Sequence, residues 1–335
     1  MLIKFFRSSY IIQYLALMLI MAALWIPGFK ANPGLPVSTG LITPLYNIIH
    51  YILGLAGSAS PAFALAMIVI SAFILNNILV YHDLTPKNNL LPAFLFIVLM
   101  SSNPQALCSY PVSAALPLFV WFLHSLYKVN DAPENYMEVF NAGMLVSVIS
   151  MIYPAALLLF FFIWLALLVF GTFNGRNLII SIIALVIPYL YLFLYYLWTD
   201  QAGEALSEYL SFLRNIINFD MVRNPVQIAV WIVFAVFMLI PAFYRVTGSL
   251  GSFGINFRKK MAATAWLVAF CIPMTVMQGN VGYQTLIFLP AAIMIAHFYH
   301  QFKKSIINEI IVLVFLFLIL LNNYLPLLNA SPVTH

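Results

Sequence analysis

The chain has 335 residues, of which 64% are hydrophobic and only 7% are charged. A water-soluble domain carries about 25% charged residues, because a surface in contact with water needs them. This composition excludes a soluble globular protein and predicts a single all-α membrane domain, a polytopic transmembrane helix bundle. The net charge of +5 is spread over short loops, so the sequence offers no basic stripe for nucleic acid.

Eleven apolar stretches have the composition of transmembrane helices, which need about 20 residues to cross the hydrocarbon core. Two of them, 89–103 and 139–152, are too short to cross without tilting, so they are either thin crossings or re-entrant segments buried in protein. No small-residue cleavage site follows the first stretch, which predicts an uncleaved N-terminal helix. The predicted spans are 10–27, 61–81, 89–103, 106–127, 139–152, 155–173, 177–198, 226–244, 261–278, 283–299 and 307–324.

The basic residues predict the orientation of the chain. With the N-terminus in the cytoplasm, 11 of the 14 Lys and Arg residues fall in cytoplasmic loops, and only Lys30, Arg214 and Arg223 fall outside. The positive-inside rule therefore predicts a bacterial inner (cytoplasmic) membrane protein with a cytoplasmic N-terminus and a periplasmic C-terminus. A nine-span arrangement in which both short segments are re-entrant also keeps the clusters 258–260 and 303–304 on the inside.

The first predicted outer loop, 28–60, contains no Asp or Glu. Its second half, from Leu45 to Leu55, repeats apolar residues at helical spacing, which predicts an amphipathic helix on the membrane surface. His50 is the only side chain of this helix that titrates near neutral pH. It is a candidate catalytic base, and the alternative is an ordinary interfacial residue.

The second predicted outer loop, 199–225, carries the remaining candidates for a polar site. Asp200, Glu204 and Glu208 recur every four residues, which predicts a shared face of an amphipathic helix. Such a loop can bind a cation, or a phosphate through two arginines. The alternative is a solvated surface helix with weak ion pairs. The full predicted polar site comprises His50, Asp200, Glu204, Glu208, Arg214, Asp220 and Arg223.

The inner side of the predicted bundle carries scattered titratable residues. His82 lies in an inner loop, His124 and His297 lie near inner helix ends, and Asp83 and Asp131 precede the two short segments. The two aspartates indicate either ordinary helix N-caps or the starts of a duplicated helical hairpin. No charged residue falls near the middle of a predicted span, which argues against an ion-coupled carrier.

The sequence predicts neither a metal centre nor a cofactor site. No His-x-x-x-His pair or cysteine pair shares a helical face at ligand spacing, and His297 and His300, which are three apart and could touch one ligand, have no apparent third ligand. Cys108 and Cys271 are interpreted as separate buried thiols. No glycine-rich phosphate loop is present. Accordingly, no catalytic residue is assigned.

The layout resembles the membrane glycosyltransferases that use polyprenyl-phosphate sugars (GT-C type), with an inner N-terminus, a long first outer loop with a surface helix, and a later outer loop. The chain is also similar to an uncharacterised multi-pass inner-membrane protein family of Bacteroidetes. The residues that carry this second resemblance are 141–143 (Asn-Ala-Gly), 153–156 (Tyr-Pro-Ala-Ala), 175–177 (Gly-Arg-Asn) and 187–189 (Ile-Pro-Tyr).

The first resemblance implies a catalytic Asp or Glu in the first outer loop, and this chain has neither there. We therefore predict a non-catalytic relative that acts in cell-envelope glycan or lipid biogenesis. Its expected partners are membrane lipids and a polyprenyl-phosphate-linked substrate or a partner membrane enzyme. The alternatives are a transporter or flippase for an amphipathic solute, and an active glycosyltransferase that uses the carboxylates of loop 199–225.

Overall fold

The computed structural model describes residues 2–31, 41, 43–55, 60–102, 111–131, 136–214, 225–249, 251, 253–276, 286–301 and 306–329. These residues form helices joined by turns, without any strand, which confirms the predicted all-α class. The helices in chain order are α1 (Leu2–Phe5), α2 (Ile11–Ala31), α3 (Pro44–Leu55), α4 (Ser60–Tyr81), α5 (Leu91–Met100), α6 (Pro111–Asp131), α7 (Tyr136–Ile152), a 3-10 turn (Pro154–Leu157), α8 (Leu158–Phe170), α9 (Gly175–Trp198), α10 (Ala202–Arg214), α11 (Pro225–Ile232), a π-helical stretch (Val233–Leu239), α12 (Ile240–Ser249), α13 (Ile255–Val276), α14 (Phe288–Gln301) and α15 (Ile306–Asn329).

Each of the eleven predicted spans coincides with a helix, and the two predicted surface helices are α3 and α10. Among the described helices, six are long and apolar enough to cross a membrane by themselves. The helices α5, α7 and α8 are also apolar but shorter. Together with the six long helices, they make the chain a multi-pass integral membrane protein.

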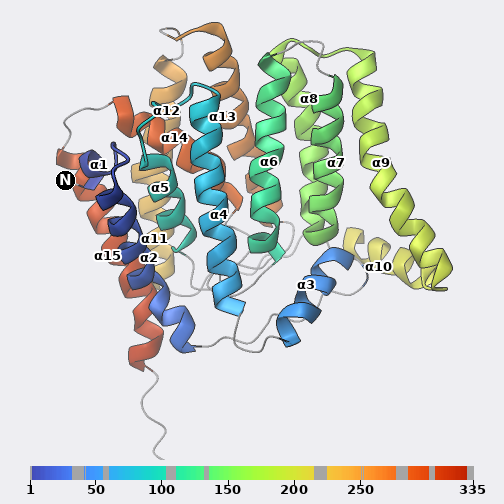
Figure 1. The fold of residues 1–335 in the computed structure, drawn as a ribbon, viewed down its shortest axis with the longest axis horizontal. Coiled ribbons are helices and arrows are strands. Elements are labelled where there is room, and N and C mark those ends of the chain that lie inside the picture. The colour runs from blue at the N-terminus through green and yellow to red at the C-terminus, as the bar shows by residue number, and fades with distance from the viewer. Residues whose placement is uncertain are drawn as a thin grey trace, which may run out of the picture.

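The long helices run between the two ends of the bundle, with α11, the π-helical stretch and α12 forming one continuous rod, and α3 and α10 lie at one of these ends (Figure 1). We call this the outer end and the opposite one the inner end, after the predicted orientation. The helix termini that carry Lys128, Arg176 and Lys260 lie at the inner end (Figure 1). These three residues are among the eleven that the positive-inside rule predicts to be cytoplasmic.

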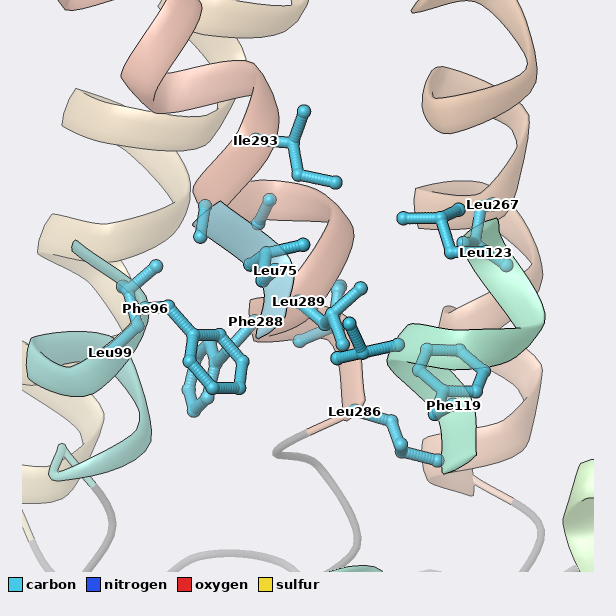
Figure 2. Packing of buried hydrophobic residues seen from close by; sticks show 14 of the residues in the cluster. Leu75, Phe96, Leu99, Phe119, Leu123, Leu267, Leu286, Phe288, Leu289 and Ile293 are labelled. Atoms are coloured by element: carbon cyan, nitrogen blue, oxygen red, sulfur yellow. The ribbon is translucent and has the colours of Figure 1, made fainter. Parts of the chain in front are cut away.

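The core is built around two helices that have no exposed face. All ten residues of α5 are buried, and so are residues 288–299 of α14. Figure 2 shows Phe96 and Leu99 of α5 beside Phe288 and Leu289 of α14, with side chains of α4, α6 and α13 around them. A helix that is apolar on every side belongs in an interior. At 1.5 Å per residue α5 is far shorter than the hydrocarbon core, and its neighbours shield its ends.

Buried amides satisfy the carbonyl groups at the end of α5. Asn323 Nδ2 donates to the Ser101 carbonyl at 3.1 Å, and Asn322 Nδ2 donates to the Ser102 carbonyl at 3.3 Å and to Gln227 Oε1. Trp25 Nε1 donates to Ser101 Oγ at 2.9 Å. A helix end inside a membrane protein needs such partners because no water reaches its last carbonyls. This network therefore explains how so short a helix persists within the bundle.

The structure corrects the interpretation of Asp83 and Asp131 as N-caps. Asp131 is the last residue of α6, and Asp83 follows the end of α4 with a φ of 57°. The Leu84 amide donates to the Leu79 carbonyl at 2.9 Å, which closes α4 with a Schellman turn. At the N-terminus of α5 the N-cap position is Leu90, and Asn89 Oδ1 accepts a hydrogen bond from the Leu91 amide at 3.0 Å. Aspartate tolerates the left-handed conformation better than most residues, which suits it to end α4.

Candidate functional site

The structure describes five of the seven residues of the predicted polar site, and Asp220 and Arg223 lie outside the described residues. Glu204 and Arg214 of α10 are exposed, and His50 of α3 is half-buried, with its ring 6.1 Å from that of Tyr46. The site as a whole therefore stays a prediction.

Asp200 also differs from the prediction, because it is not part of α10. The helix begins only at Ala202, and Asp200 ends α9 with a φ of 56°. The Gln201 amide donates to the Tyr196 carbonyl at 2.9 Å, which forms a Schellman turn. The expected acidic face of α10 therefore reduces to Glu204 and Glu208.

Glu208 has a structural partner in the first outer loop. Its Oε2 accepts a hydrogen bond from the Leu41 amide at 2.6 Å, and Tyr196 Oη donates to the Leu41 carbonyl at 2.7 Å. Both polar groups of one peptide residue are thus held by side chains of α9 and α10. A backbone amide bonded to a carboxylate contributes more than a neutral pair. These two hydrogen bonds connect Leu41 of the first outer loop to α9 and α10.

We expect Glu208→Ala to speed hydrogen exchange at the Leu41 amide by about tenfold, because a hydrogen bond to a charged group contributes about 1.5–3 kcal/mol. Glu208→Gln keeps an acceptor oxygen and should show a smaller change. Exchange measured by mass spectrometry in detergent tests this directly. Equal protection in all three proteins would show that Glu208 does not hold the loop.

Two adjoining cavities flank the outer end of α9. The first, of about 450 Å³, lies between α9 and α10. Its walls are one stripe of each helix, with residues recurring three and four apart, so a single face of α9 opposes a single face of α10. The lining residues are Tyr189, Leu192, Phe193 and Tyr196 of α9 and Ala202, Gly203, Ala205, Leu206 and Tyr209 of α10.

The second cavity, of about 500 Å³, lies between α9 and α3 and shares Leu192 and Tyr196 with the first. It is lined by Leu41, Pro44, Leu45, Asn47, Ile48, Tyr51, Met151, Leu192, Tyr195, Tyr196 and Gln201. The loop residue Leu41 therefore forms part of this wall, and its bonds to Tyr196 and Glu208 help to shape the cavity.

The described lining of both cavities is apolar and aromatic, with hydroxyl and amide groups but no charged side chain. Burial raises the pKa of the Tyr209 phenol, so this group stays protonated and uncharged at neutral pH. Phe193 and Leu206 are largely exposed at the rim of the first cavity. An apolar rim at the outer end of a membrane bundle favours entry from the lipid side. Such a site can hold a hydrocarbon chain against aromatic rings.

Within the part of the chain that the structure describes, no His, Cys, Asp or Glu side chains group as metal ligands. Cys271 of α13 is a buried free thiol, as predicted, and Cys108 lies outside the described residues.

The sequence analysis missed a second polar cluster, which lies at the inner end. It joins His82, His124, Asp131 and Lys260 from the termini of α4, α6 and α13. The sequence indicated this cluster only in so far as all four residues were predicted on the inner side of the membrane. Their mutual contacts depend on which helices are neighbours, and a single sequence does not contain that information.

Comparison with protein-family models gave no match, and comparisons with curated proteins and with solved structures gave none either.

Proposed function

We propose that this integral membrane protein binds the hydrocarbon chain of a lipid-linked molecule at its outer end and does not itself catalyse transfer. The pair of uncharged, tyrosine-lined cavities on either side of α9 carries this proposal. Hydrocarbon chains bind through apolar contacts alone, and a concave apolar site next to the membrane provides such contacts. Polyprenyl-phosphate-linked molecules are the proposed class, because the predicted layout resembles that of glycosyltransferases that use such lipids.

The position of the acidic residues supports a binding role over a catalytic one. The first outer loop supplies no carboxylate, and Glu208 already holds the Leu41 amide. Asp200 lies in the turn that ends α9, and Glu204 is exposed. A general base must reach the acceptor that it activates. None of these three carboxylates lines either cavity.

Filling the first cavity should remove the ligand. Ala205 is buried in its wall, and we expect Ala205→Trp to lower the amount of co-purified or added polyprenyl phosphate at least several-fold, as measured by native mass spectrometry. Ile183→Trp is the matched control, because Ile183 lies on the same helix, is 48% exposed and lines neither cavity.

Competition identifies the ligand class. Unlabelled polyprenyl phosphate in excess should displace labelled polyprenyl phosphate from the protein, whereas an equal excess of phosphatidylethanolamine should not. Equal displacement by both would show that the cavities hold bulk lipid without selectivity. Equal ligand retention in Ala205→Trp and Ile183→Trp would contradict the site itself.

A further inference from the structure

Four titratable side chains form a continuous chain of contacts at the inner end. Lys260 Nζ of α13 lies 2.6 Å from Asp131 Oδ1 of α6, and Asp131 Oδ2 lies 3.0 Å from His82 Nδ1 at the end of α4. His82 Nε2 then lies 3.0 Å from Nδ1 of His124, which is also on α6. These four side chains therefore link α4, α6 and α13 through polar contacts.

Hydrogen-bond accounting favours one placement of the protons. The Lys260 ammonium can only donate, and it lies closer to Asp131 Oδ1, at 2.6 Å, than to His82 Nδ1, at 3.2 Å. We assign the His82 proton to Nδ1, where it is donated to Asp131 Oδ2, so His82 Nε2 accepts from His124 Nδ1–H. In this arrangement both histidines are neutral, and the ammonium and the carboxylate balance each other.

The four side chains differ in their exposure to water. The side chains of His82 and Lys260 are 0% and 5% exposed, whereas that of Asp131 is 39% exposed. The basic nitrogen left on His124 is its Nε2, and this residue is half-buried. A proton can therefore enter from water at Asp131 or His124 and pass along the hydrogen bonds to the buried imidazole.

The surroundings disfavour a further positive charge. Lys260 Nζ lies only 3.2 Å from His82 Nδ1, and Lys128 of α6 faces His124. Glu138 of α7 also faces His124 but is engaged with Lys128 at 3.5 Å. Tyr81 and Tyr127 meet the His82 ring edge-on.

We propose that the His124–His82–Asp131–Lys260 chain is a proton-binding site, and that proton uptake there loosens the inner end of α13 from α4 and α6. One added proton turns a balanced set of charges into a net cation. When this proton rests on His82, a second buried cation lies beside Lys260. The repulsion between them weakens the attraction that holds Lys260 to the other two helices.

The direction of the pH dependence follows from the same contacts. Burial, followed by the charge of Lys260, lowers the pKa of His82 from 6.5 to about 4. As pH falls below 6.5 the unfolded chain takes up a proton that the folded protein does not. The free energy of unfolding therefore decreases between pH 6.5 and about 4, and the contribution of His82 is fully present only above this window.

Spin-label distances test the proposal on the full chain in nanodiscs. Labels at Asn77→Cys on α4 and Asn256→Cys on α13, both exposed positions, report the separation of the two helices after Cys108→Ser and Cys271→Ala remove the native thiols. We expect a single distance at pH 7.5 and a growing longer-distance population towards pH 4.5. An unchanged distance distribution over this range would overturn the proposal.

Two variants distinguish proton binding at this site from non-specific unfolding of the protein at low pH. His82→Gln keeps a polar side chain that does not titrate, so the acid response should disappear. Lys260→Met removes the nearby cation, so the midpoint should move to higher pH by about one unit or more. His50→Gln, at the outer end, should leave the response unchanged. An acid response that persists in His82→Gln, or a midpoint that does not rise in Lys260→Met, would contradict the assignment.

Discussion

Gly143→Ala is expected to destabilise the protein by about 1–3 kcal/mol, because there is no room for a methyl group between α7 and α9. A Cβ atom at Gly143 would lie 2.7 Å from the Ala184 Cβ and 3.0 Å from the Ser181 carbonyl oxygen. Small residues allow helix backbones to approach closely in membranes, where packing drives association. Because the oxygen belongs to the backbone, relief requires the helices to separate. Gly143→Leu should prevent stable packing of α9.

This first prediction is measured by thermal unfolding in detergent. Unfolding is monitored through the reaction of a fluorescent maleimide with the Cys271 thiol, which is buried in the folded protein. Gly203→Ala in α10 is the matched control, because a Cβ there meets nothing within 4 Å. The double variant Gly143→Ala/Ala184→Gly should recover part of the lost stability, since it removes the closer of the two contacts. A neutral Gly143→Ala variant would show that α7 and α9 do not pack as described.

Asp131→Ala is expected to cost on the order of 3 kcal/mol, because it leaves the Lys260 ammonium buried without its closest anion. Removing the partner of a buried charge is more damaging than removing both charges, since the remaining buried charge keeps its desolvation cost. We therefore expect Asp131→Ala/Lys260→Met to be markedly more stable than Asp131→Ala alone.

The same thiol-reactivity assay measures this second prediction at pH 7.5. Glu204→Ala is the control, because Glu204 is an exposed carboxylate of α10 whose removal should change stability by less than about 1 kcal/mol. If the double variant is no more stable than Asp131→Ala, the two side chains are not coupled and the inner-end chain is wrongly assigned.

The apolar runs of the sequence predict the helices well, since each run must satisfy its backbone internally in a membrane. They do not predict which helix becomes central. α9 is long and strongly apolar, yet most of its residues are exposed, whereas the shorter α14 is enclosed. The difference lies in which helices pack together, as with Gly143 and Ala184, and composition does not encode it.

The candidate site was predictable only in part. The surface helices of both outer loops follow from their periodicity, and α3 and α10 confirm them. The role of Glu208 does not follow, because its partner Leu41 is 167 residues away in the chain. Periodicity also placed Asp200 on the helix, whereas the left-handed turn after α9 separates it from α10. The tyrosines that line the cavities occur on apolar helices, where sequence alone favours a membrane-interface role.

The most direct test of the outer-end site is a map of cross-links from a diazirine-bearing polyprenyl phosphate in proteoliposomes. After irradiation, digestion and mass spectrometry, we predict adducts concentrated on cavity residues such as Leu192, Tyr196 and Ala205. Adducts spread along the exposed face of α9, at positions such as Ile183 and Leu190, and missing from the cavities would contradict lipid-chain binding at this site.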